Sequence, residues 1–196
     1  MGDVKLDLGC GNKRRDGFFG VDRYPCDAAD LLCDITQTLP FKTGSVTAVC
    51  LDNLIEHILD IPRLLAEIVR VCRDGATITI ITPHFSALDS WRDPTHIHHL
   101  SYFSMDHVEE PRARHYIGRG LRVSSRRLSF SRNLMGSIGR LIFRLSPRVY
   151  EKQFCFVFRA RVLHFELRVD KSSDDRLPPS TSAATIPLSK RTGAGL

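Results

Sequence analysis

Two glycines follow the first apolar segment of the chain and form a turn that could hold a ligand. Lys5-Leu6-Asp7-Leu8 is typical of a buried strand, which breaks at Gly9-Cys10-Gly11-Asn12. Glycines there adopt positive φ angles and let the backbone pass close to a bound molecule. The carboxyl end of the first strand is where open α/β sheets bind ligands. We therefore predict ligand contacts at Asp7 and at Gly9, Cys10, Gly11 and Asn12.

Acidic residues close the next predicted strands and would share the rim of the sheet with this turn. Asp22-Arg23 ends the second strand, Asp34-Ile35 the third and Asp52-Asn53 the fourth. An acid at the end of the second strand can accept hydrogen bonds from two ribose hydroxyls. A carboxylate-rich rim suits a cationic ligand better than a phosphate, which favours a sulfonium nucleoside. A dinucleotide is disfavoured because Arg14 stands where its fingerprint needs a third glycine.

The elements that must position these residues follow from the apolar pattern. Short apolar runs at 4–8, 18–22, 30–34, 46–51 and 76–82 alternate with loops and helical segments, which is typical of a parallel α/β sheet. Apolar residues from Ile61 to Cys72 recur at helical spacing, after Asp60 as N-cap and before Asp74-Gly75 as the predicted end.

The second half of the chain changes character. Residues 83–120 are rich in histidine, proline, serine and aromatic residues, and we expect an irregular lobe on the substrate side. Residues 121–130 and 154–169 resemble long strands, and 132–146 form an apolar stripe at helical spacing with arginines beside it. We expect one domain over 1–171, with its substrate side at 83–150, and a disordered tail at 172–196.

The motifs resemble, in order, those of the class I S-adenosylmethionine-dependent methyltransferases of the type 11 kind. The matching segments are Asp7-Leu8-Gly9-Cys10-Gly11, Gly20-Val21-Asp22, Leu39-Pro40-Phe41, Leu54-Ile55-Glu56-His57 and Arg73-Asp74-Gly75-Ala76. The resemblance implies a Rossmann-like α/β fold, a mostly parallel seven-stranded sheet with an antiparallel final strand. It implies S-adenosylmethionine as the cofactor, with Asp22 on the ribose, Asp34 near adenine and Asn53 beside the methyl group.

Two departures from the common pattern concern the substrate side. About ten residues separate Gly11 from Val21, so the first helix is expected to be only a turn or two. The first strand begins near Met1, without the preceding helices that often cap the substrate pocket. The resemblance is to a compact branch of the family, and substrate recognition is expected from 83–150 or from a partner subunit.

Histidines after the fifth strand are candidates for a catalytic base. Methyl transfer mainly requires alignment of the acceptor and removal of a proton, and imidazole changes protonation near neutral pH. We predict His96 as the base, His84 as the second choice, and Asp93 as the carboxylate that orients it. Asp93, His96, His98 and His99 could instead hold a divalent metal, but no metal is expected. His57 is expected to be structural or to support the site.

The acceptor is only partly constrained by the sequence. The Pro-Pro pair of amino-group methyltransferases acting on bases and the Pro-Cys pair of cytosine enzymes are both absent after the fourth strand. A hydroxyl is favoured, on a sugar, a lipid-linked saccharide or a small metabolite. Two alternatives remain: a non-catalytic subunit that binds S-adenosylmethionine, and an RNA methyltransferase.

Charge is divided unevenly along the chain, whose net charge is +6. Residues 111–171 hold 15 Lys and Arg against 3 Asp and Glu. Arg126, Arg127, Arg132, Arg140, Arg144 and Arg148 are expected around the apolar stripe of 134–145. Such a helix could lie on an anionic membrane or bind RNA phosphates, although a helix packed on the sheet with solvated arginines explains the same pattern.

Cellular location is inferred from what the sequence lacks. There is no signal-peptide pattern, and no apolar run approaches the roughly 18 to 20 residues of a membrane span. Six cysteines are scattered without a C-x-x-C pair, which favours reduced structural thiols. We expect a cytoplasmic protein, with possible peripheral membrane contact.

Overall fold

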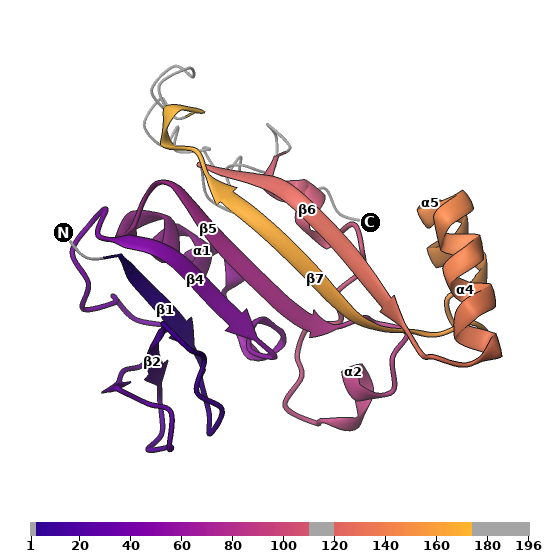
Figure 1. Ribbon diagram of the computed structural model, residues 1–196, viewed down its shortest axis with the longest axis horizontal. Coiled ribbons are helices and arrows are strands. Elements are labelled where there is room, and N and C mark those ends of the chain that lie inside the picture. Colours follow the sequence, from indigo (N-terminus) through magenta and orange to yellow (C-terminus); the bar gives the residue numbers. More distant parts are fainter. Residues whose placement is uncertain (1–2, 110–119, 174–196) are drawn as a thin grey trace, which may run out of the picture.

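A seven-stranded sheet organises the computed structural model, which describes residues 3–109 and 120–173 (Figure 1). The strands are β1 Val4–Leu8, β2 Phe19–Asp22, β3 Leu31–Leu32, β4 Val46–Asp52, β5 Cys72–Pro83, β6 Leu121–Phe130 and β7 Ala160–Val169. The helices are α1 Ile61–Val71, α2 Asp89–Arg92, α4 Leu134–Leu145 and α5 Pro147–Val149. Single helical turns lie at Ile55–His57, Ser104–Val108, Tyr150–Phe154 and Lys171–Ser173.

The strand order is β3-β2-β1-β4-β5-β7-β6. The first five strands are parallel, and β7 runs antiparallel to both β5 and β6. The predicted fold, a mostly parallel sheet with an antiparallel final strand, is confirmed. Because β6 then runs in the same direction as β1 to β5, the carboxyl ends of these six strands meet at one rim.

The main core lies on one face of the sheet. Leu6, Val49, Ile78 and Leu167 are neighbours across β1, β4, β5 and β7, and each is fully buried. Buried residues of α1 and of the segment around Met105 complete this core. On β7 the intervening residues (His164, Glu166 and Arg168) are exposed, so this strand alternates between the core and solvent.

Helix α1 forms where the apolar spacing predicts it. The Asp60 side chain accepts a hydrogen bond from the Arg63 backbone N–H, and Pro62 occupies the first turn. Leu64, Leu65 and Ile68 are buried against the sheet. The helix ends at Val71, three residues before the predicted Asp74, because Cys72 is already extended and pairs with Val46 of β4.

No helix follows the glycine turn, contrary to the expectation of one or two helical turns. Residues 9–18 form turns only. The segment Lys13–Gly17 offers no apolar stripe that could pack on the sheet, and Gly17 has a φ of 75°, outside the helical region. The connection to β2 is therefore a loop held by hydrogen bonds rather than by a packed helix.

The strand expected at 154–169 begins at Ala160 instead. Residues 150–154 form a helical turn around Tyr150, which is fully buried. The Tyr150 hydroxyl donates a hydrogen bond of 2.7 Å to the Phe158 carbonyl. Phe130, Tyr150, Cys155 and Ala160 form a small second core. Apolar character at 154–159 therefore reflects this cluster and not a strand.

Helix α4 confirms the helix expected at 132–146. The Asn133 side chain accepts a hydrogen bond of 2.9 Å from the Gly136 N–H and caps its first turn. Figure 1 shows α4 and α5 beyond the edge strand β6, away from the other helices. None of the helices in the described ranges has the length and apolar content needed to cross a bilayer.

Two sequence-based expectations lie wholly or partly outside the described residues. The irregular lobe is described over 83–109, where it contains α2 and the turn at Ser104–Val108, but not over 110–119. Most of the tail predicted at 172–196 also lies outside the described ranges.

The N-cap of α1 gives a first prediction. Asp60→Ala removes the acceptor for the Arg63 N–H and should lower the free energy of unfolding by about 1 kcal/mol. Asp60→Asn keeps an acceptor oxygen and should stay within a few tenths of a kcal/mol of the wild type. Chemical denaturation of both variants measures the difference; equal losses would show that the cap is not the stabilising contact.

Candidate active site

The glycine turn is bound to the end of β2. The Gly9 N–H donates to the Val21 carbonyl at 2.8 Å, and the Gly11 N–H donates to the Asp22 Oδ2 at 2.9 Å. Gly9 and Gly11 have φ angles of 67° and 54°, which residues with a side chain rarely adopt. A Cβ on Gly9 would lie 2.7 Å from the Leu54 Cδ1. The turn therefore needs glycine for its conformation and, at Gly9, for space.

A first cavity of about 340 Å³, the rim cavity, lies beside this turn at the tips of β2 and β3. Its lining contains the predicted residues Gly9, Asp22, Arg23, Asp34 and Ile35. It also contains five residues that we did not predict as ligand contacts: Tyr24, Thr36, Leu54, His57 and Ile58. The Leu54 and His57 positions lay within a family motif, but Tyr24 and Thr36 had no comparable sequence signal.

The Asp34 carboxylate is held in the rim cavity by its own loop. Its Oδ1 accepts hydrogen bonds from the Thr36 N–H at 3.0 Å and the Thr36 hydroxyl at 2.7 Å. These hydrogen bonds lower the pKa of Asp34, so the carboxylate stays ionised. An ionised, fixed acceptor suits an amino group of a ligand.

A second cavity of about 600 Å³, the loop cavity, continues from Gly9 along the glycine turn. It is lined by Asp7, Gly9, Cys10, Gly11, Asn12, Lys13, Arg14, Arg15, Asp52 and Asn53. All eleven residues predicted to contact the cofactor thus line the rim cavity or the loop cavity.

Arg15 is the principal residue of the loop cavity that sequence reasoning missed. Its Nη2 lies 3.1 Å from Asp52 Oδ2, and its Nε lies 3.6 Å from Asp7 Oδ2. Asp7 is buried, and burial raises its pKa although Arg15 opposes the shift. The Nε of Arg15 is buried and has no hydrogen-bond partner among the described residues. With Lys13 and Arg14, the cavity therefore offers three cations and two carboxylates to a zwitterionic ligand.

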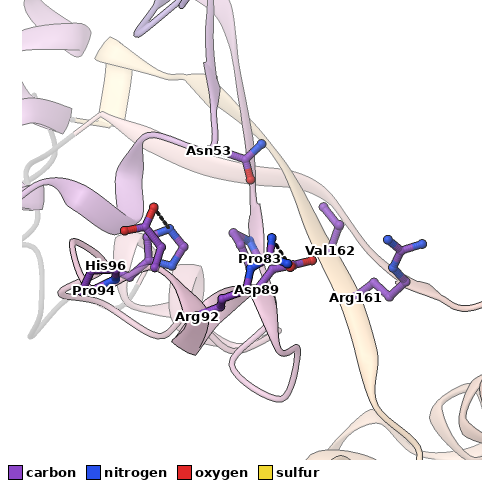
Figure 2. Close-up of a pocket in the computed structure, with 9 residues that line it drawn as sticks. Asn53, Pro83, Asp89, Arg92, Pro94, His96, Arg161 and Val162 are labelled. Carbon is purple, nitrogen blue, oxygen red and sulfur yellow. Dashed lines mark ion pairs between the residues drawn. The ribbon is translucent and has the colours of Figure 1, made fainter.

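Asn53 connects the loop cavity with a third cavity of about 550 Å³, the lobe cavity. Asn53 has a φ of 52°, an uncommon value for a residue other than glycine. Its N–H donates to the Ile81 carbonyl at 2.8 Å. Figure 2 shows the lobe cavity, which is lined by Asn53, Pro83, Asp89, Arg92, Asp93, Pro94, His96, Arg161 and Val162.

His96 lines the lobe cavity with an oriented imidazole. Its Nδ1 lies 3.1 Å from the Ser90 carbonyl, to which it donates in the tautomer that leaves Nε2 unprotonated. The Nε2 lies 3.9 Å from Asp93 Oδ2 and 4.0 Å from Glu56 Oε1 (Figure 2 marks an ion pair at His96). Asp93 in turn accepts from the Thr95 N–H and hydroxyl through Oδ1. The predicted base and its carboxylate are therefore adjacent.

Glu56 is a buried acid of this site that we did not predict. It is 1% exposed, its Oε2 accepts from the Thr82 hydroxyl at 3.0 Å, and its Oε1 has no hydrogen-bond partner among the described residues. Burial raises the pKa of Glu56, although the Thr82 hydrogen bond and the nearby histidines oppose the shift. The Glu-His motif signalled this position, but only the fold places it beside His96.

His84, the second choice as base, lies apart from the three cavities, so we do not propose it as the base. His84 is fully buried and lines none of the three cavities. Its Nδ1 accepts from the Ser86 N–H at 3.1 Å, and its Nε2 lies 2.9 Å from Glu151 Oε1. With both ring nitrogens bonded, His84 joins the end of β5 to the turn at 150–154.

The metal ligands considered from the sequence do not come together as a set. His99 stacks on Trp91 at 3.7 Å between ring centroids and hydrogen-bonds to the Ser90 hydroxyl. Among the described residues, His96 instead lies with Glu56 and His57, whose candidate ligand atoms are all within 4.8 Å of one another. This arrangement could hold a divalent ion; His57 and His96 have hydrogen-bond partners without one, whereas Glu56 Oε1 has none among the described residues.

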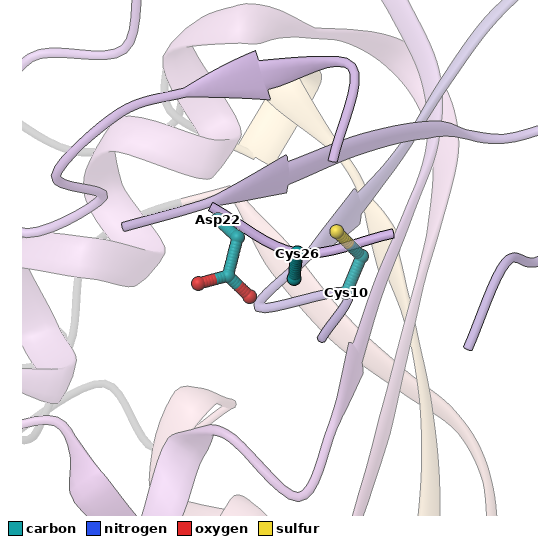
Figure 3. Close-up of side chains that lie close together, drawn as sticks. All are labelled: Cys10, Asp22 and Cys26. Atoms are coloured by element: carbon teal, nitrogen blue, oxygen red, sulfur yellow. The ribbon is translucent and has the colours of Figure 1, made fainter. Parts of the chain in front are cut away.

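Cys10, Asp22 and Cys26 form the second cluster of this kind in the described chain (Figure 3). Both Asp22 oxygens already accept backbone hydrogen bonds, from Gly11 and Tyr24. Burial and the neighbouring Cys26 raise the pKa of Cys10 to about 12. A protonated thiol is a poor metal ligand, so the cluster is best explained as packing of the glycine turn. All six cysteines are free thiols.

Comparisons with known proteins agree with this geometry. Residues 6–80 match the family model described as a methyltransferase domain. A SAM-dependent methyltransferase from Archaeoglobus fulgidus is similar in structure, with 16% identity, 85% of this chain and 86% of that chain covered, and a TM-score of 0.55. No curated protein sequence matches the chain significantly.

Two further solved structures have the same fold. A putative methyltransferase in complex with the Haloferax volcanii Trm112 activator has 17% identity, covers 87% of this chain and 83% of that chain, and gives a TM-score of 0.54. A geranyl diphosphate methyltransferase in complex with SAM has 16% identity, coverage of 86% and 78%, and a TM-score of 0.53. At these identities, the likeness establishes the fold and not the acceptor.

Asp22 allows a direct test of the rim cavity. Asp22→Ala removes a charged acceptor and the partner of the Gly11 N–H, and should weaken binding of S-adenosylhomocysteine by about 10- to 100-fold, equivalent to about 1.5–3 kcal/mol. Asp27→Ala removes the same charge from an exposed position of the same connection and should leave the affinity unchanged. Calorimetry measures both; equal effects would exclude a specific role for Asp22.

Glu56 predicts an unusual dependence of stability on pH. The native carboxyl keeps its proton to higher pH than the carboxyl of the unfolded chain, so its contribution to stability is lost as pH rises through the raised pKa. The melting temperature of Glu56→Gln relative to the wild type should therefore increase from about pH 5 to pH 8. Glu166→Gln, at an exposed position, should show no such trend. Parallel melting curves for Glu56→Gln and the wild type would contradict the assignment.

Proposed function

We propose that the chain, whose residues 6–80 match a methyltransferase domain and whose fold is shared with SAM-dependent methyltransferases, is a class I S-adenosylmethionine-dependent methyltransferase that methylates a hydroxyl group held in the lobe cavity. The observation that carries this proposal is the continuity of the three cavities. Gly9 lines both the rim cavity and the loop cavity, and Asn53 lines both the loop cavity and the lobe cavity. The methyl group of a cofactor lying along the first two projects from the sulfur in the middle of the molecule, and we propose that it points past Asn53 into the third.

The rim cavity fits the adenosine part of the cofactor. Asp22 retains acceptor capacity for ribose hydroxyls beside the glycine turn, because each carboxylate oxygen has two lone pairs. Asp34 offers an ionised acceptor for the adenine amino group. Leu54 and Ile58 supply apolar surface for the base, and the exposed ring of Tyr24 could cover it.

The loop cavity fits the methionine part. The Arg15 guanidinium could bind the carboxylate through charge-assisted hydrogen bonds. Asp7 and Asp52 would attract the ammonium and sulfonium groups. The narrow space at Gly9, where a Cβ would reach Leu54, lies between the two parts. When bound, the cofactor supplies a methyl group on a positively charged sulfur.

His96 is proposed as the group that receives the acceptor proton. As the hydroxyl oxygen attacks the methyl carbon and the carbon–sulfur bond breaks, its proton passes to the Nε2 of His96. The resulting imidazolium would be stabilised by Asp93 and Glu56, whose carboxylate oxygens lie 3.9 and 4.0 Å from that nitrogen. The Ser90 carbonyl keeps the ring in the required orientation.

The polar lining of the lobe cavity favours a hydroxylated acceptor. Its lining includes two arginines that can donate hydrogen bonds, Arg92 and Arg161, and one carboxylate that can accept them, Asp89. Recognition of several hydroxyl groups requires both donors and acceptors. A sugar, a lipid-linked saccharide or a small hydroxylated metabolite fits this lining. We propose that the reaction takes place in the cytoplasm, where the cofactor and such precursors are available.

Methyl transfer from labelled donor to fractionated cell extract tests the proposed activity. Label should enter an aqueous saccharide fraction or a lipid fraction, and the product should resist conditions that cleave methyl esters. Label found only in RNA or protein, or no transfer despite cofactor binding, would contradict the proposal.

Substitution of His96 tests the proposed base. His96→Ala should lower kcat by about 100- to 10,000-fold with little change in cofactor affinity, because His96 lines the lobe cavity and neither of the two cavities proposed for the cofactor. His164→Ala, an exposed histidine on β7, should keep full activity. A chelator should not reduce turnover; loss of activity restored by zinc would instead indicate a metal held by Glu56, His57 and His96.

A further inference from the structure

Helix α4 presents three leucine side chains to solvent. Leu134 is 76% exposed, Leu141 59% and Leu145 80%. These residues recur at intervals of seven and four along the helix, so they form one stripe along its outer side. Met135, which is 46% exposed, lies beside the stripe. An amphipathic helix packed on a globular core would turn this stripe inward.

Glycines on the opposite side of α4 explain why the helix packs this way. Gly136 and Gly139 are its buried residues. A Cβ on Gly136 would lie 2.1 Å from the Ser131 carbonyl oxygen, and one on Gly139 would lie 2.9 Å from the Phe158 carbonyl oxygen. Only residues without a side chain allow this close approach at these two positions, and Phe143 packs on the same side of the helix against Phe130 and Tyr150. The leucine stripe is therefore exposed as a consequence of how the helix is seated.

Positive charge borders the leucine stripe. Arg140 and Arg144 lie on one flank of α4, and Arg148 follows in α5. None of these three arginines forms an ion pair with another residue of the described ranges. The sequence from 111 to 150 contains ten arginines and no Asp or Glu. The surface thus combines exposed leucines with uncompensated positive charge.

We propose that α4 lies in the surface of an anionic lipid bilayer, with the leucine stripe among the acyl chains and the arginines at the headgroups. Apolar side chains on one side and arginines at the boundary are the pattern of helices that bind in the plane of a membrane. A second copy of the chain on this surface would bring unpaired arginines together. RNA would be bound by the arginines but would leave the leucines in water.

The place of α4 in the fold gives membrane binding a consequence for the acceptor. β6 ends at Phe130, which pairs with Ala160 of β7, and α4 follows directly. The next residues of β7, Arg161 and Val162, line the lobe cavity. A membrane-bound α4 would therefore hold the lobe cavity near lipid-anchored acceptors, a consequence that rests on the proposed function.

Vesicle cosedimentation of the full chain tests the proposal. The wild type should bind vesicles containing about one third phosphatidylglycerol and not vesicles of phosphatidylcholine alone, and binding should weaken as salt is raised. Arg140→Gln with Arg144→Gln should lower the partition coefficient about 25-fold, or about fivefold for each charge. Leu141→Ser and Leu145→Ser should each lower it at least about tenfold.

Matched controls separate this surface from general effects. Leu59→Ser changes a leucine that is 84% exposed outside α4, and Arg73→Gln removes an exposed arginine of β5; both should bind like the wild type. Calorimetry with S-adenosylhomocysteine confirms that each variant is folded, and vesicle binding itself requires no cofactor or acceptor. The membrane proposal can therefore fail while the proposed activity stands.

Three outcomes would overturn the proposal. The first is vesicle binding that survives both leucine substitutions. The second is a dimer in the absence of lipid that dissociates on Leu141→Ser, which would assign the stripe to a second copy. The third is RNA binding that is lost with the arginines but retained with the serine variants, together with no vesicle binding.

Discussion

The short loop after β1 depends on hydrogen bonds from the end of β2. The usual support for such a glycine turn is a helix that packs on the sheet, and residues 9–18 form none. Three sets of contacts support the turn instead. The Gly9 N–H donates to the Val21 carbonyl, and the Gly11 N–H donates to the Asp22 carboxylate. Arg15 forms ion pairs with Asp7 and Asp52. The same carboxylates that shape the turn also line the cavities beside it. The proposed cofactor site and the local structure therefore depend on the same groups.

Electrostatics divide the site into regions with different tasks. The rim and loop cavities carry carboxylates that suit a cofactor with a positively charged sulfur and an ammonium group. The lobe cavity adds a histidine whose ring is fixed by a carbonyl and faces two acids. Glu56 is buried, and one of its carboxyl oxygens has no hydrogen-bond partner among the described residues, so its ionised form lowers the stability of the fold. Carboxyl groups with such raised pKa values are common at functional sites.

The lobe cavity, where we propose that the acceptor binds, lies at the ends of β4 and β5 and the start of β7. β6 ends and β7 begins at the same rim of the sheet, and α4 and α5 lie in the connection between them. The glycine face of α4 anchors it to the small core around Tyr150, and its leucines remain available for an external contact. A compact chain can thus combine a cofactor site with an element whose partner is outside the protein.

The sequence by itself determined the sheet, α1 and the residues around the cofactor cavities, because strand periodicity, caps and the glycine turn are local signals. The sequence also predicted the helix α4, but not which of its sides is buried. Gly136 and Gly139 are buried because the helix backbone approaches Ser131 and Phe158 there, and only the fold shows this approach. His84 and His96 looked equivalent as loop histidines. The fold buried His84 against Glu151 and placed His96 beside Glu56, and both contacts join segments that are far apart in the chain. Arg15 was missed for the same reason: its partners come from two different strands.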